Sequence, residues 1–434
     1  MPAAKHARYD VTTGSDVVDQ VVEEQYRDYP YPLRNPEDER RRLRATTLGN
    51  LHRVSGLFWG GRRNPNTLRL LDAGCGTGDS AIYMAAQAPG ATVVALDRSP
   101  ASLDIARRRA EVRGLGNVEF VAASLLDLPR LGLGPFDHIV CSGVLHHLPA
   151  PETGLQALMA VLAPDGGLGL MLYGLYGRLA IYPMQDLLRR LGGDLPLTER
   201  ATLAQEVVES LWPHHFFKAL GLHRSSDDLT QGGAAGVIDL LLHARDRAYT
   251  VDQVHDLLAG AGARLLTFSR PLLYRPDGYP MTDTMRRQMT TLDERGRQGV
   301  CELLNGRLAK HEFFATRAGF VPDVPSPGAA PGAVRPLVYE PLVRDDFSRL
   351  PIASQGFDRS TEGCTINLAL SPVDAALLRA IDGERTLEGV FREARRLLVR
   401  EGVRPSDTEL ADAWARLFAS LEAVAYAGLC WARQ

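Results

Sequence analysis

The stretch LLDAGCGTG, residues 70–78, closes an apolar run and carries three glycines at alternate positions. Glycine has no Cβ, so the backbone can turn sharply there and approach a bound ligand closely. Gly74, Gly76 and Gly78 follow the order i, i+2, i+4, whereas the dinucleotide-binding fingerprint has its glycines at i, i+2 and i+5. The spacing therefore predicts a ligand-binding turn of another kind between a strand and a helix. Asp72, just before the turn, could meet a cationic group.

The residues around this turn alternate between short apolar runs and amphipathic stretches. Such alternation predicts right-handed strand–helix–strand crossovers and a mainly parallel sheet. We expect an α/β fold with a doubly wound, mainly parallel, seven-stranded sheet. The expected strands are 68–73, 92–96, 118–122, 136–141, 168–173, 264–269 and 311–317, with helices at 79–87, 100–114, 151–162 and 251–261.

A second acid, Asp97, ends the apolar run that follows the first helix. It lies about 20 residues beyond the glycine turn, the distance at which a doubly wound sheet places a carboxylate that accepts both hydroxyls of a ribose. Such a carboxylate also argues against a ligand with a 2′-phosphate. The turn and the acid together predict a ribose-containing ligand at the carboxyl edge of the sheet.

Residues of about 67–173 resemble the class I S-adenosylmethionine-dependent methyltransferases, in which D-x-G-x-G-x-G is the first cofactor motif. The later motifs of that family are matched by VEFVAASLLDLP (118–129), FDHIVCSGVLHHL (136–148) and LAPDGG (162–167). The resemblance implies a Rossmann-like fold, S-adenosylmethionine as the cofactor and methyl transfer as the activity. It says almost nothing about the acceptor.

The resemblance also implies a role for each matching position in cofactor binding. The three glycines would pass under the methionine part of the cofactor, and Asp72 would help to hold its amino group. Asp97 would bind the ribose, with Arg98 flanking the adenine. The backbone of Ser142 and Gly143 would close the pocket beside the methionine.

The sequence departs from the family pattern after the third strand. Many family members have an acid there that receives the exocyclic amine of the adenine, whereas this chain has Ser124 followed by Leu125. We expect Ser124 or its backbone to serve instead.

Side chains that handle the acceptor are expected at the same sheet edge. His147 follows the fourth strand and Tyr176 the fifth, while His243 and Tyr249 precede the helix at 251–261. These four are the candidate catalytic residues, because an acceptor that starts as an ammonium or a hydroxyl needs a base. For each of them, a packing role within its loop is the alternative.

The chain divides into segments of different composition. Tyr26, Tyr29 and Tyr31 precede the first strand, and the resemblance to class I methyltransferases implies that they form a lid over the cofactor; aromatic contacts on the surface are the alternative. We expect an N-terminal lid or substrate segment at 1–66, a methyltransferase domain at 67–320 with a helical insertion at 174–250, a Pro/Gly linker at 321–336 and a small, mostly helical domain at 337–434.

The small C-terminal domain weakly resembles the winged-helix-like regulatory modules of some bacterial protein methyltransferases. A domain behind a Pro/Gly tether suits a macromolecular partner, so a protein or peptide side chain is the favoured acceptor. A small metabolite is the second hypothesis, and a catalytically inactive S-adenosylmethionine-binding regulator is the third. The same domain could instead mediate a homodimer or cap the body.

Composition disfavours several other classes. The 434 residues include 49 Lys and Arg and 52 Asp and Glu, so the net charge of −3 lacks the basic excess on which non-specific nucleic-acid binding relies. No apolar run reaches the ~20 residues that span a bilayer. The N-terminus lacks the apolar core of a signal peptide, so we expect a cytoplasmic protein. Five scattered cysteines predict neither a metal site nor a disulfide framework.

Overall fold

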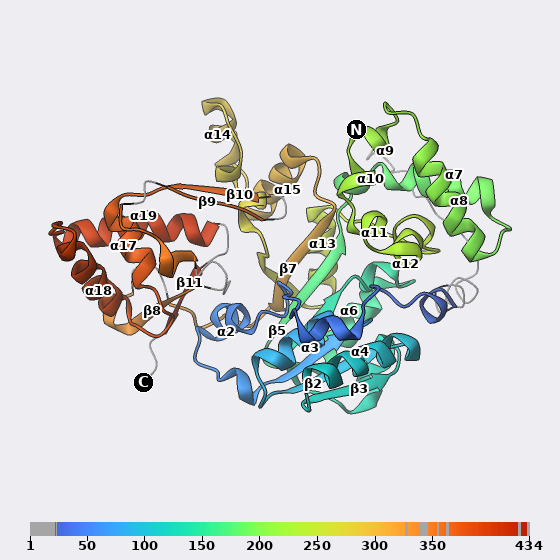
Figure 1. Ribbon diagram of the computed structural model, residues 1–434, viewed down its shortest axis with the longest axis horizontal. Coiled ribbons are helices and arrows are strands. Elements are labelled where there is room, and N and C mark those ends of the chain that lie inside the picture. Colours follow the sequence, from blue (N-terminus) through green and yellow to red (C-terminus); the bar gives the residue numbers. More distant parts are fainter. Residues whose placement is uncertain are drawn as a thin grey trace.

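A seven-stranded sheet lies at the centre of the protein, with a helical insertion at one end and the C-terminal domain at the other (Figure 1). The computed structural model describes residues 22, 24–325, 329–338, 346–353, 356–361, 364–423 and 427–431. Residues 1–21 and 23 of the expected N-terminal segment, and 326–328 of the expected linker, lie outside these ranges.

The strand order of the sheet is β3-β2-β1-β4-β5-β7-β6, in which β7 is antiparallel to both neighbours and the other pairs are parallel. This confirms the doubly wound, mainly parallel sheet. The order reverses between β1 and β4, the place where open α/β sheets bind ligands. The strands are β1 (Arg69–Ala73), β2 (Thr92–Asp97), β3 (Val118–Ala122), β4 (Phe136–Ser142), β5 (Leu162–Tyr173), β6 (Ala263–Phe268) and β7 (Lys310–Arg317).

Helices cover both faces of the sheet, so successive residues of the central strands are buried on opposite sides. In β1, Leu71 belongs to the core shared with α6 and α13, whereas Leu70 belongs to the core shared with α2, α3 and α4. These helices are α2 (Leu51–Trp59), α3 (Asp79–Gln87), α4 (Pro100–Arg113), α6 (Pro151–Val161) and α13 (Val251–Gly260). Short α5 (Leu128–Leu131), with α14 (Asp283–Met289) and α15 (Glu294–Asn305), completes the body.

The insertion between β5 and α13 is helical and has a core of its own. Its helices are α7 (Ile181–Gly192), α8 (Leu197–Ser210), α9 (Phe216–Ala219), α10 (Leu222–Ser225), α11 (Asp227–Thr230) and α12 (Gly233–Val237), followed by the π-helix η6 (Ile238–Leu242). Tyr29, from the segment before β1, packs against this core. The insertion thus lies over the same end of the molecule as the N-terminal tyrosines.

The C-terminal domain packs three helices around a separate core that includes Trp414 and Phe418. The helices are α17 (Pro372–Ala380), α18 (Leu387–Arg400) and α19 (Asp407–Ala423), and Ser371 caps the start of α17 in a capping box with Asp374. Two antiparallel pairs accompany them: β8 (Val334–Val338) with β11 (Ala427–Trp431), and β9 (Gly356–Thr361) with β10 (Cys364–Ala369).

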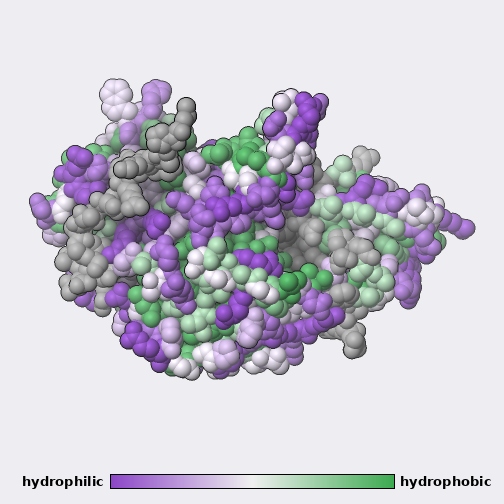
Figure 2. All heavy atoms as spheres, turned by 180° about the vertical axis from the view of Figure 1, so that it is seen from behind, coloured by the Kyte–Doolittle hydropathy of each residue, from purple (hydrophilic) through white to green (hydrophobic). Residues whose placement is uncertain are grey.

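The outer ends of the molecule carry mostly hydrophilic side chains, while apolar side chains gather nearer its middle on the face drawn in Figure 2. Within the described part of the chain, none of the helices combines the length and apolarity that a membrane crossing requires.

Candidate active site

The turn after β1 depends on glycine for both conformation and space. Gly74, Gly76 and Gly78 all have positive φ, at 77°, 52° and 93°, a region that other residues adopt at a cost. A Cβ on Gly74 would clash with the side chain of Val144, and a Cβ on Gly78 would lie 2.9 Å from the Cβ of Ala106 in α4. Because Gly78 has no side chain, α4 can pack closely against the start of α3.

Residues 26–34, which we call the strap, cross this turn from outside. A Cβ on Gly76 would lie only 2.5 Å from the carbonyl oxygen of Tyr31. The hydroxyl of Thr77 donates a hydrogen bond to the carbonyl of Pro32 at 2.8 Å. At the end of the strap, Arg34 forms an ion pair of 2.6 Å with Asp79, the first residue of α3. The expected lid segment therefore contacts the glycine turn directly.

Asp97 is fixed beside the turn by backbone donors. Its Oδ2 accepts a hydrogen bond of 2.7 Å from Gly76 N–H, and its Oδ1 accepts one of 2.8 Å from Ser99 N–H. Burial raises the pKa of this carboxyl, while the two N–H groups and neighbouring Arg98 oppose that rise. Each carboxylate oxygen has a second lone pair, so both can still accept a hydroxyl donor.

Asp72 is more deeply buried, beneath the first turn of α3. Its Oδ2 accepts a hydrogen bond of 2.8 Å from Ala81 N–H. Desolvation by burial raises its pKa to about 7, and the negative charges of Asp79 and Asp97 add to the rise. A carboxyl group in this state would be ionised more readily if a cation came beside it.

The remaining cofactor-side candidates lie on the neighbouring loops of the same sheet edge. Ser124 caps the 3₁₀ turn at Leu125–Asp127, where its hydroxyl accepts a hydrogen bond from Leu126 N–H, and Leu125 itself is buried. Ser142 is exposed at the end of β4, and Gly143 follows it with φ of 78°.

A buried polar cluster lies where the strap meets the insertion. The hydroxyl of Tyr26 donates to Asp239 at 3.0 Å and lies 3.2 Å from Nε2 of His243. The hydroxyl of Tyr173, at the end of β5, donates to the other oxygen of Asp239 at 3.3 Å. The ring of His147 stacks on that of His243, with 3.8 Å between their centroids. We call these five residues the polar chamber.

Known proteins share both the sequence motif and the fold. A family model described as a methyltransferase domain matches residues 70–166. An uncharacterized protein of Synechococcus sp. is 32% identical over 254 residues, which are 58% of this chain and 60% of that protein. The 2-heptyl-1-hydroxyquinolin-4(1H)-one methyltransferase of Mycobacteroides abscessus is 30% identical over 167 residues, 38% of this chain and 67% of that enzyme.

The chain belongs to the class I S-adenosylmethionine-dependent methyltransferases. The structure of PKMT2 from Rickettsia typhi in complex with AdoHcy shares the fold of this methyltransferase, with a TM-score of 0.64 and 17% identity over 88% of this chain and 75% of that one. The match therefore extends beyond the central sheet. S-adenosylmethionine is the cofactor of the family.

The backbone of Arg245 sets the tautomers of the two stacked histidines of the methyltransferase. Nδ1 of His147 lies 2.7 Å from the carbonyl oxygen of Arg245, which only accepts, so this nitrogen carries the hydrogen. Nδ1 of His243 accepts from the N–H of Arg245 at 3.0 Å, so its hydrogen is on Nε2. Burial lowers the pKa of both imidazoles and favours their neutral forms.

The tautomers produce a chain of donors that ends on a carboxylate. Nε2–H of His243 donates to the oxygen of Tyr26, whose hydroxyl in turn donates to Asp239. Nε2 of His147 keeps its lone pair and makes no hydrogen bond within the described part of the chain. Burial raises the pKa of Asp239 to about 7, with the negative charge of Asp228 as the next cause. Nε2 of His147 and the carboxylate of Asp239 are therefore the groups of the polar chamber that keep lone pairs at which a proton could bind.

One ligand atom from each of His147, Asp239 and His243 lies within 4.8 Å of the others, a separation that could hold a metal ion. Ligation through Nε2 of His243 would require that nitrogen to lose its hydrogen. Nδ1 would then carry a hydrogen facing the N–H of Arg245, and their hydrogen bond would be lost. The donor set therefore fits hydrogen bonding better than metal ligation.

The four sequence-derived catalytic candidates separate into two pairs. His147 and His243 meet in the polar chamber. Tyr249 is buried in the core of the sheet with the guanidinium of Arg247 over its ring, whereas the pKa of Tyr176 is raised by desolvation and then by the charges of Glu302 and Asp252. The structure does not bring either tyrosine hydroxyl to the chamber, and their catalytic roles stay predictions.

Asp239 was not among the sequence-derived candidates, although a signal for it exists. It is the single acid in the apolar run VIDLLL, residues 237–242, and it lies in the one-turn π-helix η6. Turns of this kind occur frequently at functional sites. A carboxylate inside an apolar run is costly to bury without partners, and here two tyrosines provide them.

Proposed function

We propose that this methyltransferase transfers a methyl group from S-adenosylmethionine to a side chain of a protein or peptide. The observation that carries the proposal is the polar chamber, in which a buried carboxylate, two neutral histidines and two tyrosines lie at the carboxyl edge of the sheet. The groups of the chamber that can take up a proton suit a methyl acceptor that bears protons, such as an ammonium or a hydroxyl.

The residues around the glycine turn fit the cofactor. Asp97 is held by two backbone donors and retains acceptor capacity for the ribose hydroxyls. Asp72 is a buried carboxyl without an ion-pair partner among the described residues, and the ammonium of the methionine part would supply one. Gly74, Gly76 and Gly78 would let the backbone approach the same part of the cofactor.

The loops beside the turn complete this proposed binding site. Arg98 would flank the adenine, and Ser124 and Leu125 would form the far side of the adenine pocket, with the serine hydroxyl already engaged in capping. The backbone at Ser142 and Gly143 would line the methionine end.

The cofactor supplies a methyl group on a positively charged sulfur, so transfer needs little chemical activation by the protein. The chain's own part is to position the acceptor in line and to exclude water. We assign both tasks to the strap, because Tyr26 contacts the polar chamber while Tyr31 lies over the glycine turn and donates to Asp228 at 2.5 Å.

Asp239 and His147 would receive the proton that the acceptor loses. The raised pKa of Asp239, about 7, is close to the value at which a general base works best near neutral pH. The hydroxyls of Tyr26 and Tyr173 hold that carboxylate in place, and His243 positions Tyr26. In this scheme Asp239 and His147 are the catalytic pair, and His243 is a positioning residue.

A macromolecular acceptor is supported by the helical segments that flank the central sheet. The insertion and the C-terminal domain add helical surface at both ends of the sheet (Figure 1), and PKMT2 shares this fold over most of the chain. We propose that the C-terminal domain, which begins at β8 rather than at the expected residue 337, contributes recognition or regulation.

The test uses the full chain, radiolabelled S-adenosylmethionine and a bacterial lysate separated by size. Label in protease-sensitive macromolecules supports the proposal, whereas label that is lost with ribonuclease contradicts it. We expect Asp239→Asn to lower the turnover number by about a hundredfold or more with unchanged cofactor affinity. Asp186→Asn, at an exposed site on α7, is the matched control. A variant with wild-type turnover and pH profile would remove Asp239 from the reaction.

A small-molecule acceptor is the second candidate, favoured by the Mycobacteroides abscessus relative, a 2-heptyl-1-hydroxyquinolin-4(1H)-one methyltransferase. Label confined to the small-molecule fraction of the same lysate would select it. Tight cofactor binding with no labelled product in any fraction would instead favour a regulator without catalysis.

A further inference from the structure

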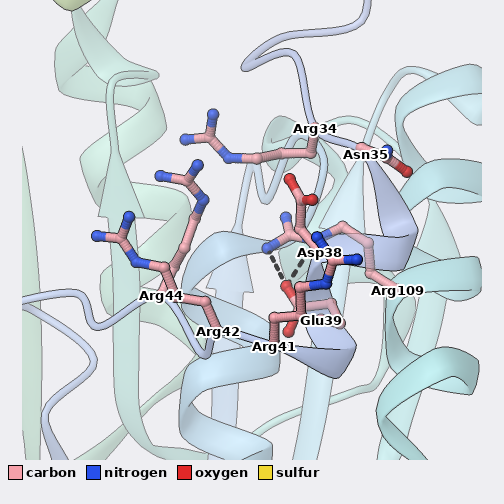
Figure 3. Close-up of a pocket in the computed structure, with 8 residues that line it drawn as sticks. All are labelled: Arg34, Asn35, Asp38, Glu39, Arg41, Arg42, Arg44 and Arg109. Atoms are coloured by element: carbon pink, nitrogen blue, oxygen red, sulfur yellow. Dashed lines mark hydrogen bonds and ion pairs between the residues drawn. The ribbon is translucent and has the colours of Figure 1, made fainter.

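A hollow lined mainly by arginine lies beside the end of the strap that is farther from the polar chamber. It has a volume of about 170 Å³ and opens to solvent next to the 3₁₀-helix η1 (Pro36–Arg40). Its lining residues are Arg34, Asn35, Asp38, Glu39, Arg41, Arg42, Arg44 and Arg109. Figure 3 shows these side chains, with the guanidinium groups of Arg34, Arg42 and Arg44 on the side away from Asp38 and Glu39.

The inner arginines already have partners. Glu39 is almost fully buried and forms ion pairs with Arg109 at 2.7 Å and with Arg113 at 2.6 Å. Asp79 forms ion pairs with Arg109 at 2.7 Å and with Arg34 at 2.6 Å. These ion pairs join η1, the strap, α3 and α4, and they account for the two inner carboxylates. Their role is to fasten the strap.

Three of the lining arginines, which we call the outer arginines, lack such partners. Arg41, Arg42 and Arg44 make no ion pair within the described ranges of the chain, and Asp38 is the one further carboxylate in the lining. Desolvation lowers the pKa of Arg44, and the positive charges of Arg34, Arg42 and Arg109 lower it further against the opposing charge of Asp79. The hollow therefore keeps a net positive charge on a chain whose overall charge is −3.

We propose that this hollow binds acidic side chains of the polypeptide that is to be methylated. Arg42 and Arg44 would form the principal contacts, with Arg41 at the rim. The identity of the occupant rests on the proposed function, whereas the anion-binding property of the hollow does not.

The number and location of the unpartnered charges favour a polypeptide over a nucleic acid. Three outer guanidinium groups match one or two carboxylates, while a nucleic acid is held by a longer series of phosphate contacts. Tyr26 and Arg34 are eight residues apart in the strap, so they are separated by less than about 30 Å. One extended substrate segment can reach both the chamber and the hollow.

The test measures binding separately from methyl transfer. A fluorescein-labelled peptide of about ten residues, half of them glutamate, is titrated with the full chain in fluorescence anisotropy, beside a glutamine peptide of equal length and a single-stranded RNA of equal charge. We expect the glutamate peptide to bind best, with an affinity that falls as salt is raised. Arg42→Gln/Arg44→Gln should weaken it by roughly three- to tenfold.

The control variant Arg189→Gln/Arg190→Gln removes the same charge from an exposed site on α7 and should bind as the wild type does. Restored binding in Arg42→Lys/Arg44→Lys would support recognition of charge. Equal affinity of the wild type and the glutamine variant, or tighter binding of RNA through the same arginines, would overturn the proposal. Peptide binding that persists while no protein is labelled would refute the proposed function and leave the hollow as an anion site.

Discussion

The substitution Asp72→Asn tests how much the free energy of unfolding is reduced by burial of the Asp72 carboxylate. In the folded protein the pKa of Asp72 is raised to about 7 from an ordinary value of 3.8. Because the folded value lies above the unfolded one, the folded state binds the proton more tightly. The contribution of Asp72 to stability is therefore greatest at low pH and is lost as the pH rises from about 4 to about 7.

The size of the effect follows from the two pKa values. A shift of about three units corresponds to about 4 kcal/mol above pH 7, which is an upper bound for the gain in the variant. Asparagine imitates the protonated carboxyl and can keep the hydrogen bond from Ala81 N–H. The difference in unfolding free energy between variant and wild type should be near zero around pH 4 and should grow to as much as that bound at pH 8.

Urea denaturation followed by circular dichroism at several pH values measures this difference, and other titrating groups cancel in it. Asp104→Asn, on the exposed side of α4, serves as the control. S-adenosylmethionine should stabilise the wild type more than the variant, because its ammonium would offset the buried charge. A variant that is less stable than the wild type at pH 8, or a difference independent of pH, would refute the reasoning.

Two further substitutions test the glycine turn and the ribose site. Gly76→Val places a branched side chain at φ of 52° and against the carbonyl of Tyr31, so S-adenosylmethionine binding should be lost in calorimetry; unchanged affinity would contradict the assignment of the turn. Asp97→Ala should weaken cofactor binding by roughly 1–3 kcal/mol through the lost charged hydrogen bonds, and an affinity equal to that of the wild type would exclude Asp97 from the ribose site.

The glycine turn and its position beside Asp97 could be predicted from the sequence because their determinants are local. The glycines and Asp72 lie in one nine-residue stretch, and the distance from the turn to Asp97 is set by one helix and one strand. The prediction for β5 was less accurate, because the sequence predicted a strand that starts at residue 168, whereas the strand begins at Leu162. Phe136 pairs with Leu162, and pairing resumes only at His138 with Gly167, an irregularity that periodicity does not reveal.

The polar chamber could be predicted only in part, because its contacts join distant segments. His147 and His243 were found through their places at the sheet edge, but Tyr26 and Asp239 are 213 positions apart in the chain. Their pairing depends on how the insertion and the strap pack, which no local pattern specifies. The same holds for Tyr249, whose side chain lies in the core although its backbone borders the site.

The pairing of β8 with β11 joins the first and last strands of the C-terminal domain. The polypeptide therefore enters and leaves that domain at neighbouring points, next to α2, where a Cβ on Gly61 would lie 2.7 Å from the Cβ of Cys430. All strands of the central sheet precede β8. This domain could thus be gained, exchanged or lost as one unit, and the methyltransferase body would keep every strand of its sheet.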